Sequence, residues 1–441
     1  MAQGSLHRGS WRSRNRGIRV GKRCVVIGQG YVGLPMALLA TSAGDSVVGL
    51  DANPAVVAQL NSGRSHIDDV SDAELSAAIE KGYRASSDRR VLAGADTVLV
   101  CVPTPLAEEG GPDLGAVIDA GTAIGEHVRP GTLVILESTT YPGTTKEVFA
   151  PLVWSRLSPE EIAVAFSPER IDPGNPTFGP RNTPKIVGGL TPDATRRARE
   201  FYEQFIDVVI EAKGAGEAEM AKLLENTFRH VNIALVNEMV RFCRELDIDL
   251  WNAIDCAETK PFGFMAFRPG PGVGGHCIPV DPVYLSHRVK AKLGYAFRMV
   301  ELAEEINHAA PRYVAERVWQ LLNERGQAVN GARILLVGVT YKPDVADRRE
   351  SPADPLALLL AKWGADVRYI DPFVPTWHVT GDGIVLTLES ESDLLQAAEG
   401  ADLVVLLQPH RRLPLAALPD VPVPVLDTRG ILDLGSEVTR L

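Results

Sequence analysis

The chain has 441 residues, of which 45% are hydrophobic and 23% are charged, and this composition is typical of a globular protein with two or three domains. Its formal net charge of −11 argues against nucleic acid or an anionic membrane surface as a partner, and no apolar run is as long as the roughly 18 residues that cross a bilayer. Five scattered cysteines without a Cys-x-x-Cys pair predict a cytoplasmic protein with neither a disulfide framework nor a metal site.

The N-terminal part of the chain predicts a doubly wound α/β domain over residues 22–214. It follows residues 1–21, which carry five arginines among Ser and Gly and which we expect to form a disordered basic tail. Apolar strand segments then alternate with helical ones, as in a parallel sheet covered by helices. The expected strands are 24–27, 47–50, 97–102, 132–136, 162–166 and 185–187.

The rest of the chain predicts a helical region followed by a second α/β domain. Residues 215–330 have few strand signals, and apolar residues at helical spacing over 218–246 predict a long helix. Strand and helix segments start again in residues 331–441, with strands at 334–339, 366–370 and 403–407. The expected fold class is therefore α/β, with two Rossmann-like doubly wound parallel-sheet domains joined by a long central helix.

A glycine-rich turn after the first strand predicts a dinucleotide site. Gly28-x-Gly30-x-x-Gly33, with Tyr31 and Val32 inside it, separates the strand from a helix, and Asp51 ends the next strand. A carboxylate there bonds the adenosine ribose and repels a 2′-phosphate, so NAD is favoured over NADP. Glycines also close such turns for packing alone, but the complete strand–turn–helix context favours cofactor binding.

Polar residues also follow three later strands of the first domain, at the sheet edge where ligands bind in such folds. They are Pro103 with Thr104, Ser138 with Thr139, and Glu169 with Arg170. The hydroxyl groups can contact a cofactor or a water molecule, and Glu169 can act as a general base. The alternatives are ordinary turns and a solvated glutamate.

Two further motifs suit catalysis on a carbonyl carbon. Lys222 and Asn226 lie one helical turn apart, where both can bond one oxyanion, although such a pair is also common on a solvated helix face. Cys277 follows a glycine-rich segment that builds no core and that suits close approach to a ligand. It can be a nucleophile or a small buried side chain, and Asp281 can be a helix N-cap or can position Lys222 and water.

Taken together, these motifs resemble the nucleotide-sugar 6-dehydrogenases, which include UDP-glucose and UDP-N-acetylhexosamine dehydrogenases. The resemblance extends over residues 23–441. The shared motifs are Gly28-x-Gly30-x-x-Gly33, Val102-Pro103-Thr104-Pro105, Ser138-Thr139 with Pro142-Gly143-Thr144, Pro168-Glu169, Lys222 with Asn226, Gly274-Gly275-x-Cys277-x-Pro279-x-Asp281, and Tyr341-Lys342-Pro343 followed by Asp347-x-Arg349-Glu350-Ser351-Pro352.

This resemblance implies an oxidation of the C6 alcohol of a UDP-sugar by two NAD molecules, through a Cys277 thiohemiacetal and thioester. It assigns residues 215–330 to a central and dimerisation domain, residues 331–441 to UDP-sugar binding, and the protein to homodimers or larger homo-oligomers. The implied catalytic residues are Cys277, Lys222, Asn226, Glu169, Thr139 and Asp281. The implied cofactor contacts are Gly28, Gly30, Tyr31, Val32, Gly33, Asp51, Pro103, Thr104, Ser138, Thr139 and Arg349. The implied substrate contacts are Glu169, Arg170, Lys222, Asn226, Arg229, Phe267, Arg268, Gly272, Gly274, Tyr341 and Lys342.

Departures from the UDP-glucose enzymes favour an N-acetylated sugar. Val280 stands where those enzymes usually carry lysine, and the 182–189 segment lacks their usual arginine. The expected order of substrates is UDP-N-acetylglucosamine, UDP-N-acetylmannosamine, UDP-N-acetylgalactosamine and UDP-glucose. Arg268 is unusual for that branch, which more often has an aromatic residue there. The competing functions are a single-step β-hydroxyacid dehydrogenase and a catalytically silent sugar-nucleotide sensor, and the Cys277 motif argues against both.

Overall fold

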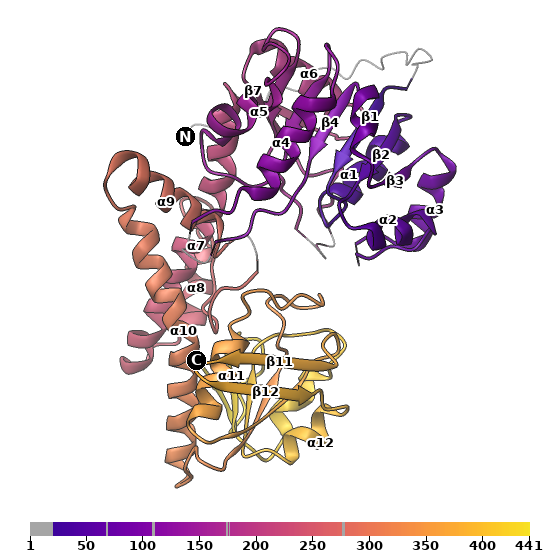
Figure 1. Ribbon diagram of the computed structural model, residues 1–441. Coiled ribbons are helices and arrows are strands. Elements are labelled where there is room, and N and C mark those ends of the chain that lie inside the picture. The colour runs from indigo at the N-terminus through magenta and orange to yellow at the C-terminus, as the bar shows by residue number, and fades with distance from the viewer. Residues whose placement is uncertain (1–20, 68, 108–110, 173–174, 176, 276–277) are drawn as a thin grey trace.

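The computed structural model describes residues 21–67, 69–107, 111–172, 175, 177–275 and 278–441. Two sheets with their covering helices are joined by long helices, which run beside both of them (Figure 1). This arrangement confirms the predicted α/β class with its long central helix. None of the helices in the described ranges is both long enough and apolar enough to span a membrane.

The N-terminal sheet has eight strands in the order β3-β2-β1-β4-β5-β6-β7-β8, and among them only β6 and β7 pair antiparallel. The strands are β1 (Arg23–Ile27), β2 (Ser46–Leu50), β3 (Arg84–Ser86), β4 (Thr97–Val100), β5 (Leu133–Leu136), β6 (Ala163–Phe166), β7 (Lys185–Gly189) and β8 (Val209–Glu211). The helices are α1 (Gly33–Ser42), α2 (Pro54–Asn61), α3 (Asp72–Glu80), η1 (Arg89–Gly94), α4 (Gly115–His127), η2 (Thr145–Phe149), α5 (Ala150–Val153) and α6 (Pro192–Tyr202).

Both faces of this sheet are buried, which explains why its central strands consist almost entirely of apolar residues. All four residues of β4, β5 and β6 are buried. One core cluster contains Leu34, Leu75 and Tyr202, from α1, α3 and α6, and the opposite cluster contains residues of α4 and α5. Helices therefore cover the sheet on both sides, as the alternating pattern of strands and helices predicts.

Four long or medium helices follow the N-terminal sheet. They are α7 (Ala215–Glu245), α8 (Leu250–Glu258), α9 (Asp281–Leu293) and α10 (Arg298–Glu324). The longest, α7, packs along α10 and also contacts α9. In Figure 1 these helices form a column that links the two sheets. The helix predicted over 218–246 is therefore present and begins three residues earlier than expected.

The C-terminal sheet is entirely parallel in its described pairs, with the strand order β10-β9-β13-β14-β15. Its strands are β9 (Arg333–Val337), β10 (Asp366–Ile370), β13 (Leu403–Leu406), β14 (Val425–Asp427) and β15 (Val438–Arg440), and its helices are α11 (Ala353–Lys362), α12 (Leu394–Glu399) and η3 (Leu415–Asp420). An antiparallel hairpin of β11 (Thr376–Gly381) and β12 (Ile384–Glu389) packs against α11.

Several short strands were not predicted. Strands β3, β8, β14 and β15 have three residues each, and β8 is partly or fully exposed at every position. Three residues are too few to show the alternation or the apolar run by which strands are recognised. Pairing with a longer neighbouring strand therefore defines these segments.

Candidate active site

A cleft of about 1560 Å³ lies where the carboxyl ends of both sheets meet. Segments that follow β1, β2, β4, β5 and β6 line it on one side, and segments that follow β9, β10, β13 and β14 line it on the other. Open α/β sheets bind ligands at this end of their strands. The volume exceeds the roughly 300–1,000 Å³ of a typical small-molecule pocket, so it suits two ligands at once.

Most of the residues predicted for the site line this cleft. They are Gly28, Gly30, Tyr31, Val32, Asp51, Pro103, Thr104, Ser138, Thr139, Glu169, Arg170, Lys222, Asn226, Arg229, Arg268, Gly272, Gly274, Tyr341, Lys342 and Arg349. Gly33, Phe267 and Asp281 are not among the lining residues, and Cys277 lies outside the described residues.

The three glycines of the first turn have different surroundings. Gly28 has φ +85°, and a Cβ atom there would lie 2.4 Å from the Cys101 carbonyl oxygen. A Cβ atom on Gly33 would lie 1.8 Å from the Gly28 carbonyl oxygen, so Gly33 allows α1 to approach the strand. Gly30 has no atom within 4 Å of such a position, which leaves open space at the cleft. The turn therefore fits a dinucleotide.

Asp51 is oriented by the backbone beside this turn. Its carboxylate accepts hydrogen bonds from the amides of Gln29 and Asn53, both at 2.9 Å. Gln29, which sequence analysis did not single out, is fully buried and its side chain donates to the Val26 carbonyl at 2.8 Å. It accepts a 2.8 Å hydrogen bond from the hydroxyl of Tyr83. These buried hydrogen bonds fix the conformation of the glycine turn beside the cleft.

One face of α7 brings together the predicted catalytic residues. The Lys222 Nζ donates to Thr139 Oγ1 at 2.5 Å and lies 3.5 Å from Glu169 Oε2. One turn along the helix, Asn226 Nδ2 donates to Asp281 Oδ2 at 2.5 Å. The Lys222 and Glu169 side chains are only 6% and 11% exposed, so this is a buried polar cluster rather than a solvated helix face.

Glu219, one turn before Lys222, anchors the segment that carries Ser138 and Thr139. Its carboxylate accepts hydrogen bonds from the Gly143 amide at 2.6 Å and from the Thr145 amide at 2.8 Å. The Thr145 hydroxyl donates to it at 2.6 Å. Burial raises the pKa of Glu219, and these donors oppose the increase. The helix therefore holds both the backbone and a hydroxyl of one loop.

Asp281 is a buried carboxylate with one unused oxygen. It is 1% exposed, and its Oδ1 has no hydrogen-bond partner among the described residues. Burial raises its pKa to about 6, and Lys222 and Asn226 oppose the increase. A carboxylate with a pKa near neutrality and a free acceptor can exchange a proton with a water molecule or a reacting group.

Helix α9, which begins at Asp281, is fastened to the turns of the N-terminal sheet. The Tyr284 hydroxyl donates to the Thr104 carbonyl and lies 3.0 Å from the Pro105 carbonyl. Arg288 forms an ion pair with Glu147 in η2. The helix that carries Asp281 is therefore bonded directly to the turn that is predicted to contact the cofactor.

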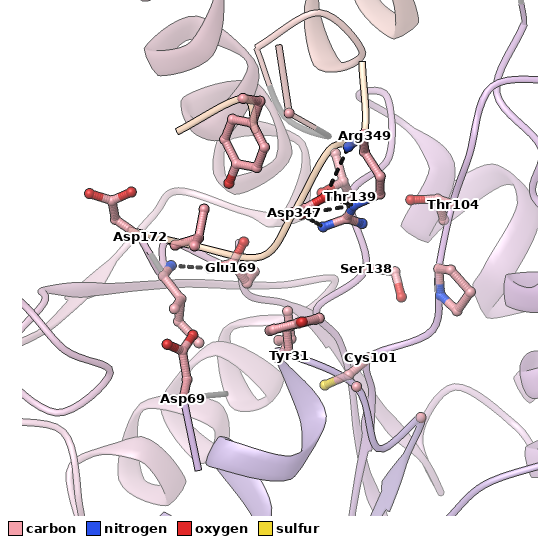
Figure 2. Close-up of a pocket in the computed structure, with 18 of the residues that line it drawn as sticks. Tyr31, Asp69, Cys101, Thr104, Ser138, Thr139, Glu169, Asp172, Asp347 and Arg349 are labelled. Carbon is pink, nitrogen blue, oxygen red and sulfur yellow. Dashed lines mark hydrogen bonds and ion pairs between the residues drawn. The ribbon is translucent and has the colours of Figure 1, made fainter. Parts of the chain in front are cut away.

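The C-terminal half adds charged groups on the opposite side of the cleft. Lys342 Nζ lies 2.5 Å from Asp172 Oδ1, and Arg349 Nη2 lies 2.6 Å from Asp347 Oδ2. Figure 2 shows the Arg349–Asp347 pair beside Thr139 at the edge of the N-terminal sheet. Burial opposes ionisation of Asp172, but Lys342 and Asn175 bring its pKa below its usual value. The Lys342–Asp172 pair connects the two halves across the cleft, whereas the Arg349–Asp347 pair lies within the C-terminal half.

Some placements differ from the sequence-based expectations. Phe267 packs edge-to-face against Phe228 at 5.7 Å instead of lining the cleft. The cleft is also lined by Phe373, Arg412 and Arg429, which were not predicted. Arg429 follows β14, and the edge rule that found Thr104 and Ser138 would have found it if this three-residue strand had been recognised.

The described cysteines of the first sheet are poor nucleophiles. Burial, together with Asp45 and Glu137, raises the pKa of the Cys24 thiol. Burial and Glu137 likewise raise the pKa of Cys101, although Cys101 lines the cleft. Both thiols therefore remain protonated, Cys24 as a small buried side chain in β1 and Cys101 as a partly buried side chain directly after β4.

The glycine turn predicts different consequences for two similar substitutions. Gly33→Ala should destabilise the protein by roughly 1–3 kcal/mol, because its Cβ atom meets the Gly28 carbonyl oxygen. Gly30→Ala should leave stability nearly unchanged and weaken NAD binding instead, because its Cβ atom would enter the cleft. Thermal unfolding and calorimetric titration with NAD separate the two effects. Equal losses of stability in both variants would contradict this assignment.

The buried Asp281 predicts a pH-dependent gain of stability for Asp281→Asn. Because the folded-state pKa of about 6 is above the ordinary value of 3.8, the folded protein binds more protons, and ionised Asp281 costs roughly 3 kcal/mol above pH 6. The variant should therefore be more stable than the wild type at pH 8, with the difference vanishing toward pH 4. Urea unfolding at both pH values tests this. A variant that is less stable at pH 8 would show that the carboxylate is favourable there.

Comparison with known proteins identifies the family. Residues 22–206 match the NAD binding domain of the UDP-glucose/GDP-mannose dehydrogenase family, residues 216–309 match its central domain, and residues 335–434 match its UDP binding domain. These matches confirm the resemblance seen in the sequence motifs and the expected cofactor, NAD.

Individual relatives agree with this assignment and differ in their named sugars. The chain is 35% identical to the NDP-N-acetyl-D-galactosaminuronic acid dehydrogenase of Ralstonia solanacearum, over 95% of this chain and 98% of the relative. It is 35% identical to the UDP-N-acetyl-D-glucosamine 6-dehydrogenase of Pseudomonas aeruginosa, over 80% of this chain and 83% of the relative. The solved structure of the UDP-D-ManNAc dehydrogenase from Pyrococcus horikoshii matches with a TM-score of 0.84 and 30% identity, over 95% and 98% of the two chains. The chain therefore belongs to the UDP-glucose/GDP-mannose dehydrogenase family and is an NAD-dependent UDP-sugar dehydrogenase.

Proposed function

We propose that the protein oxidises the C6 hydroxymethyl group of a UDP-N-acetylhexosamine to a carboxylate, with UDP-N-acetylglucosamine as the first candidate. The observation that carries this proposal is the α7 face, on which Lys222 and Asn226 meet Thr139, Glu169 and Asp281. We assign residues 22–214 to NAD binding, residues 215–330 to the central region with Cys277, and residues 331–441 to UDP-sugar binding.

The proposed reaction has two oxidation steps on one carbon. The C6 alcohol first loses a hydride and a proton and becomes an aldehyde. The Cys277 sulfur then adds to the aldehyde carbon, and the resulting thiohemiacetal still carries the hydrogen that a second hydride transfer requires. This transfer produces a thioester, and water releases the acid and the thiol. One alcohol, two NAD⁺ and one water therefore give one carboxylic acid, two NADH and two protons.

NAD, when bound, would accept the hydride, and the residues of the chain position the sugar and stabilise its charge. Lys222 and Asn226 are placed to bond the oxygen on C6 as it becomes an alkoxide or a tetrahedral oxyanion. Lys222 Nζ contacts both Glu169 and Thr139, so the carboxylate of Glu169 and the hydroxyl of Thr139 lie beside the same ammonium group. We propose that Glu169, Thr139 and Asp281 position or deprotonate the hydrolytic water, and the pKa of Asp281, about 6, suits a base at neutral pH.

Basic residues of both halves are placed to hold the nucleotide. Lys342, with Tyr341 before it, and Arg229 on α7 line the cleft. Arg170 also lines it and pairs with Glu225 at 2.7 Å. A diphosphate would compete with Asp172 for Lys342, because a phosphate group offers more acceptor oxygens and more charge than one partly exposed carboxylate. We assign Arg349 to the cofactor side, because it faces the edge that carries Ser138 and Thr139.

The N-acetylated sugar is supported by the residues that differ from UDP-glucose enzymes. Val280 and the 182–189 segment resemble the N-acetylhexosamine branch. The relatives described above act, by their names, on three different N-acetylated sugars. UDP-N-acetylmannosamine is therefore the second candidate, followed by UDP-N-acetylgalactosamine and then UDP-glucose.

The number of NADH molecules released for each sugar consumed tests the reaction. The purified protein should release two NADH for each UDP-N-acetylglucosamine and form a uronic acid, because both oxidations occur before the product leaves. The assay should also include UDP-N-acetylmannosamine, UDP-N-acetylgalactosamine and UDP-glucose, with absorbance at 340 nm and mass spectrometry of the product. One NADH for each sugar would contradict the four-electron reaction, and a faster reaction with another sugar would replace the first candidate.

Two Cys277 variants provide the control for the covalent step. Cys277→Ala should form no acid, because the aldehyde has no sulfur to capture it. Cys277→Ser should be slower than the wild type by several orders of magnitude, because a serine hydroxyl is a much weaker nucleophile than a thiolate. Acid formation at the wild-type rate in Cys277→Ala would exclude the thioester.

We also propose that the protein forms homodimers through α7. Leu224, Phe228, Leu235, Phe242 and Leu246 are 45–64% exposed. Their spacings of four, seven, seven and four residues place the first four on one stripe of the helix, and Leu246 directly follows the end of the helix. Exposed apolar side chains that repeat at heptad spacing along a long helix are typical of helix–helix pairing. A second copy of α7 packed by a two-fold axis would cover the stripe with its own equivalent.

Leu235→Glu should separate this dimer, because two-fold symmetry would place a buried carboxylate on each side of the interface. Analytical ultracentrifugation should show a shift from twice the chain mass of 47.6 kDa to one chain mass. Val385→Glu, at a 71% exposed position on the β11–β12 hairpin, is the matched control and should remain dimeric. A wild-type protein that sediments as a monomer would rule out the α7 interface.

A further inference from the structure

The C-terminal sheet contains a buried histidine–aspartate pair beneath the cleft. His410 follows β13 and Asp371 follows β10, and both side chains are fully buried. His410 Nε2 lies 3.0 Å from Asp371 Oδ2. Burial acts to raise the pKa of Asp371, but His410 and two backbone amides bring it below its usual value, so this carboxylate is ionised.

The hydrogen bonds of His410 define its tautomer. The backbone amide of Asp344 donates to Nδ1 at 3.0 Å, so Nδ1 carries a lone pair. The proton is therefore on Nε2, which faces Asp371 Oδ2 and, at 3.3 Å, the hydroxyl oxygen of Thr340. That hydroxyl donates its own proton to the Lys342 carbonyl at 2.9 Å. All contacts are consistent with a neutral imidazole that accepts from the loop and donates to the aspartate.

The segment held in this way is the 340–344 loop at the cleft. Asp344 has φ +62°, a left-handed conformation that is unfavourable for a residue with a side chain. Its amide is fixed by His410, and its carboxylate accepts a 2.9 Å hydrogen bond from the Arg411 amide. The Tyr341 carbonyl accepts from Gln408 at 2.7 Å. Contacts from the 408–411 segment therefore maintain a strained loop conformation.

This loop reaches both the predicted nucleotide contacts and the glycine segment before Cys277. Lys342 and Asp344 line the cleft. A Cβ atom on Gly274 would lie 2.8 Å from the Tyr341 Cβ atom, and one on Gly275 would lie 2.7 Å from the Tyr341 ring. The glycines thus let the Tyr341 side chain pack directly against the chain that leads to Cys277. A shift of the loop would move Lys342 and remove this support together.

We propose that His410 is a positioning residue of the sugar-nucleotide site, which fixes the 340–344 loop through the Asp344 amide while Asp371 holds its tautomer. His410 does not line the cleft, so it acts through Lys342 and Tyr341 and not by touching the ligand. The inference rests on the proposed function in one respect, namely that this loop contacts the nucleotide part of the substrate.

Two substitutions separate the two hydrogen bonds of His410. In His410→Asn the amide oxygen lies near the former Nδ1 position and can still accept from Asp344, whereas the bond to Asp371 is lost. In His410→Gln the amide nitrogen lies near the former Nε2 position and can donate to Asp371, whereas the Asp344 amide is left without an acceptor. Both variants remove the ring from the same buried position, so a purely structural role predicts similar losses in both.

The experiment measures three quantities: the dissociation constant of UDP by calorimetry, the KM of the UDP-sugar that serves as substrate, and the melting temperature of each variant. We expect His410→Gln to weaken UDP binding and raise the sugar KM by roughly tenfold or more, with kcat and the KM of NAD changing less than about threefold. His410→Asn should recover most of the affinity at a similar melting temperature.

The outcomes also separate this inference from the proposed function. Equal UDP affinities in the two variants, or a wild-type protein that binds no UDP, would overturn the role of His410. If the wild type oxidises none of the four sugars but binds UDP with the expected difference between variants, the proposed function fails and the role of His410 stands.

Discussion

Three side chains on one face of α7 hold three separate segments of the chain in register. Glu219 binds the backbone of the loop after β5, Lys222 contacts Thr139 in that loop and Glu169 after β6, and Asn226 contacts Asp281 at the start of α9. Steps of three and four residues place these groups on the same side of a helix, so a straight segment of α7 is sufficient to align them. The arrangement of the site depends on this helix remaining packed between the sheet and α9.

The polar groups of this site are buried. Burial strengthens their electrostatic interactions, and it also makes an ionised group without a full set of partners unfavourable for stability. Asp281 has one oxygen without a partner in the described structure and a pKa near 6, as expected for a carboxylate that is removed from water. In the N-terminal sheet, by contrast, the buried Glu137 is paired with Lys185 at 2.7 Å. This contrast agrees with the catalytic role proposed above for Asp281, because a stability role would favour a paired or a neutral side chain.

On the side of the cleft formed by the C-terminal sheet, buried side chains that accept backbone hydrogen bonds hold the turns in place. The 340–344 loop has one residue in the left-handed region and is held by side chains that follow β10 and β13. Asp427 plays a similar part in the turn after β14, where its two carboxylate oxygens accept from the amides of residues 429 to 432. Buried acceptors beneath both turns therefore aim Lys342 and Arg429 at the cleft.

The sequence by itself determined the features that depend on local chemistry. The glycine turn, the apolar strands, the long helix and the pair Lys222 and Asn226 were all predicted, because φ angles, periodicity and helical spacing are properties of neighbouring residues. Only the tertiary structure decided which distant residues support them, as for Glu219 with Gly143 and His410 with Asp344. These partners are 76 and 66 positions apart, and their contacts depend on how α7 packs on the N-terminal sheet and on which strands are neighbours in the C-terminal sheet, which no local pattern encodes.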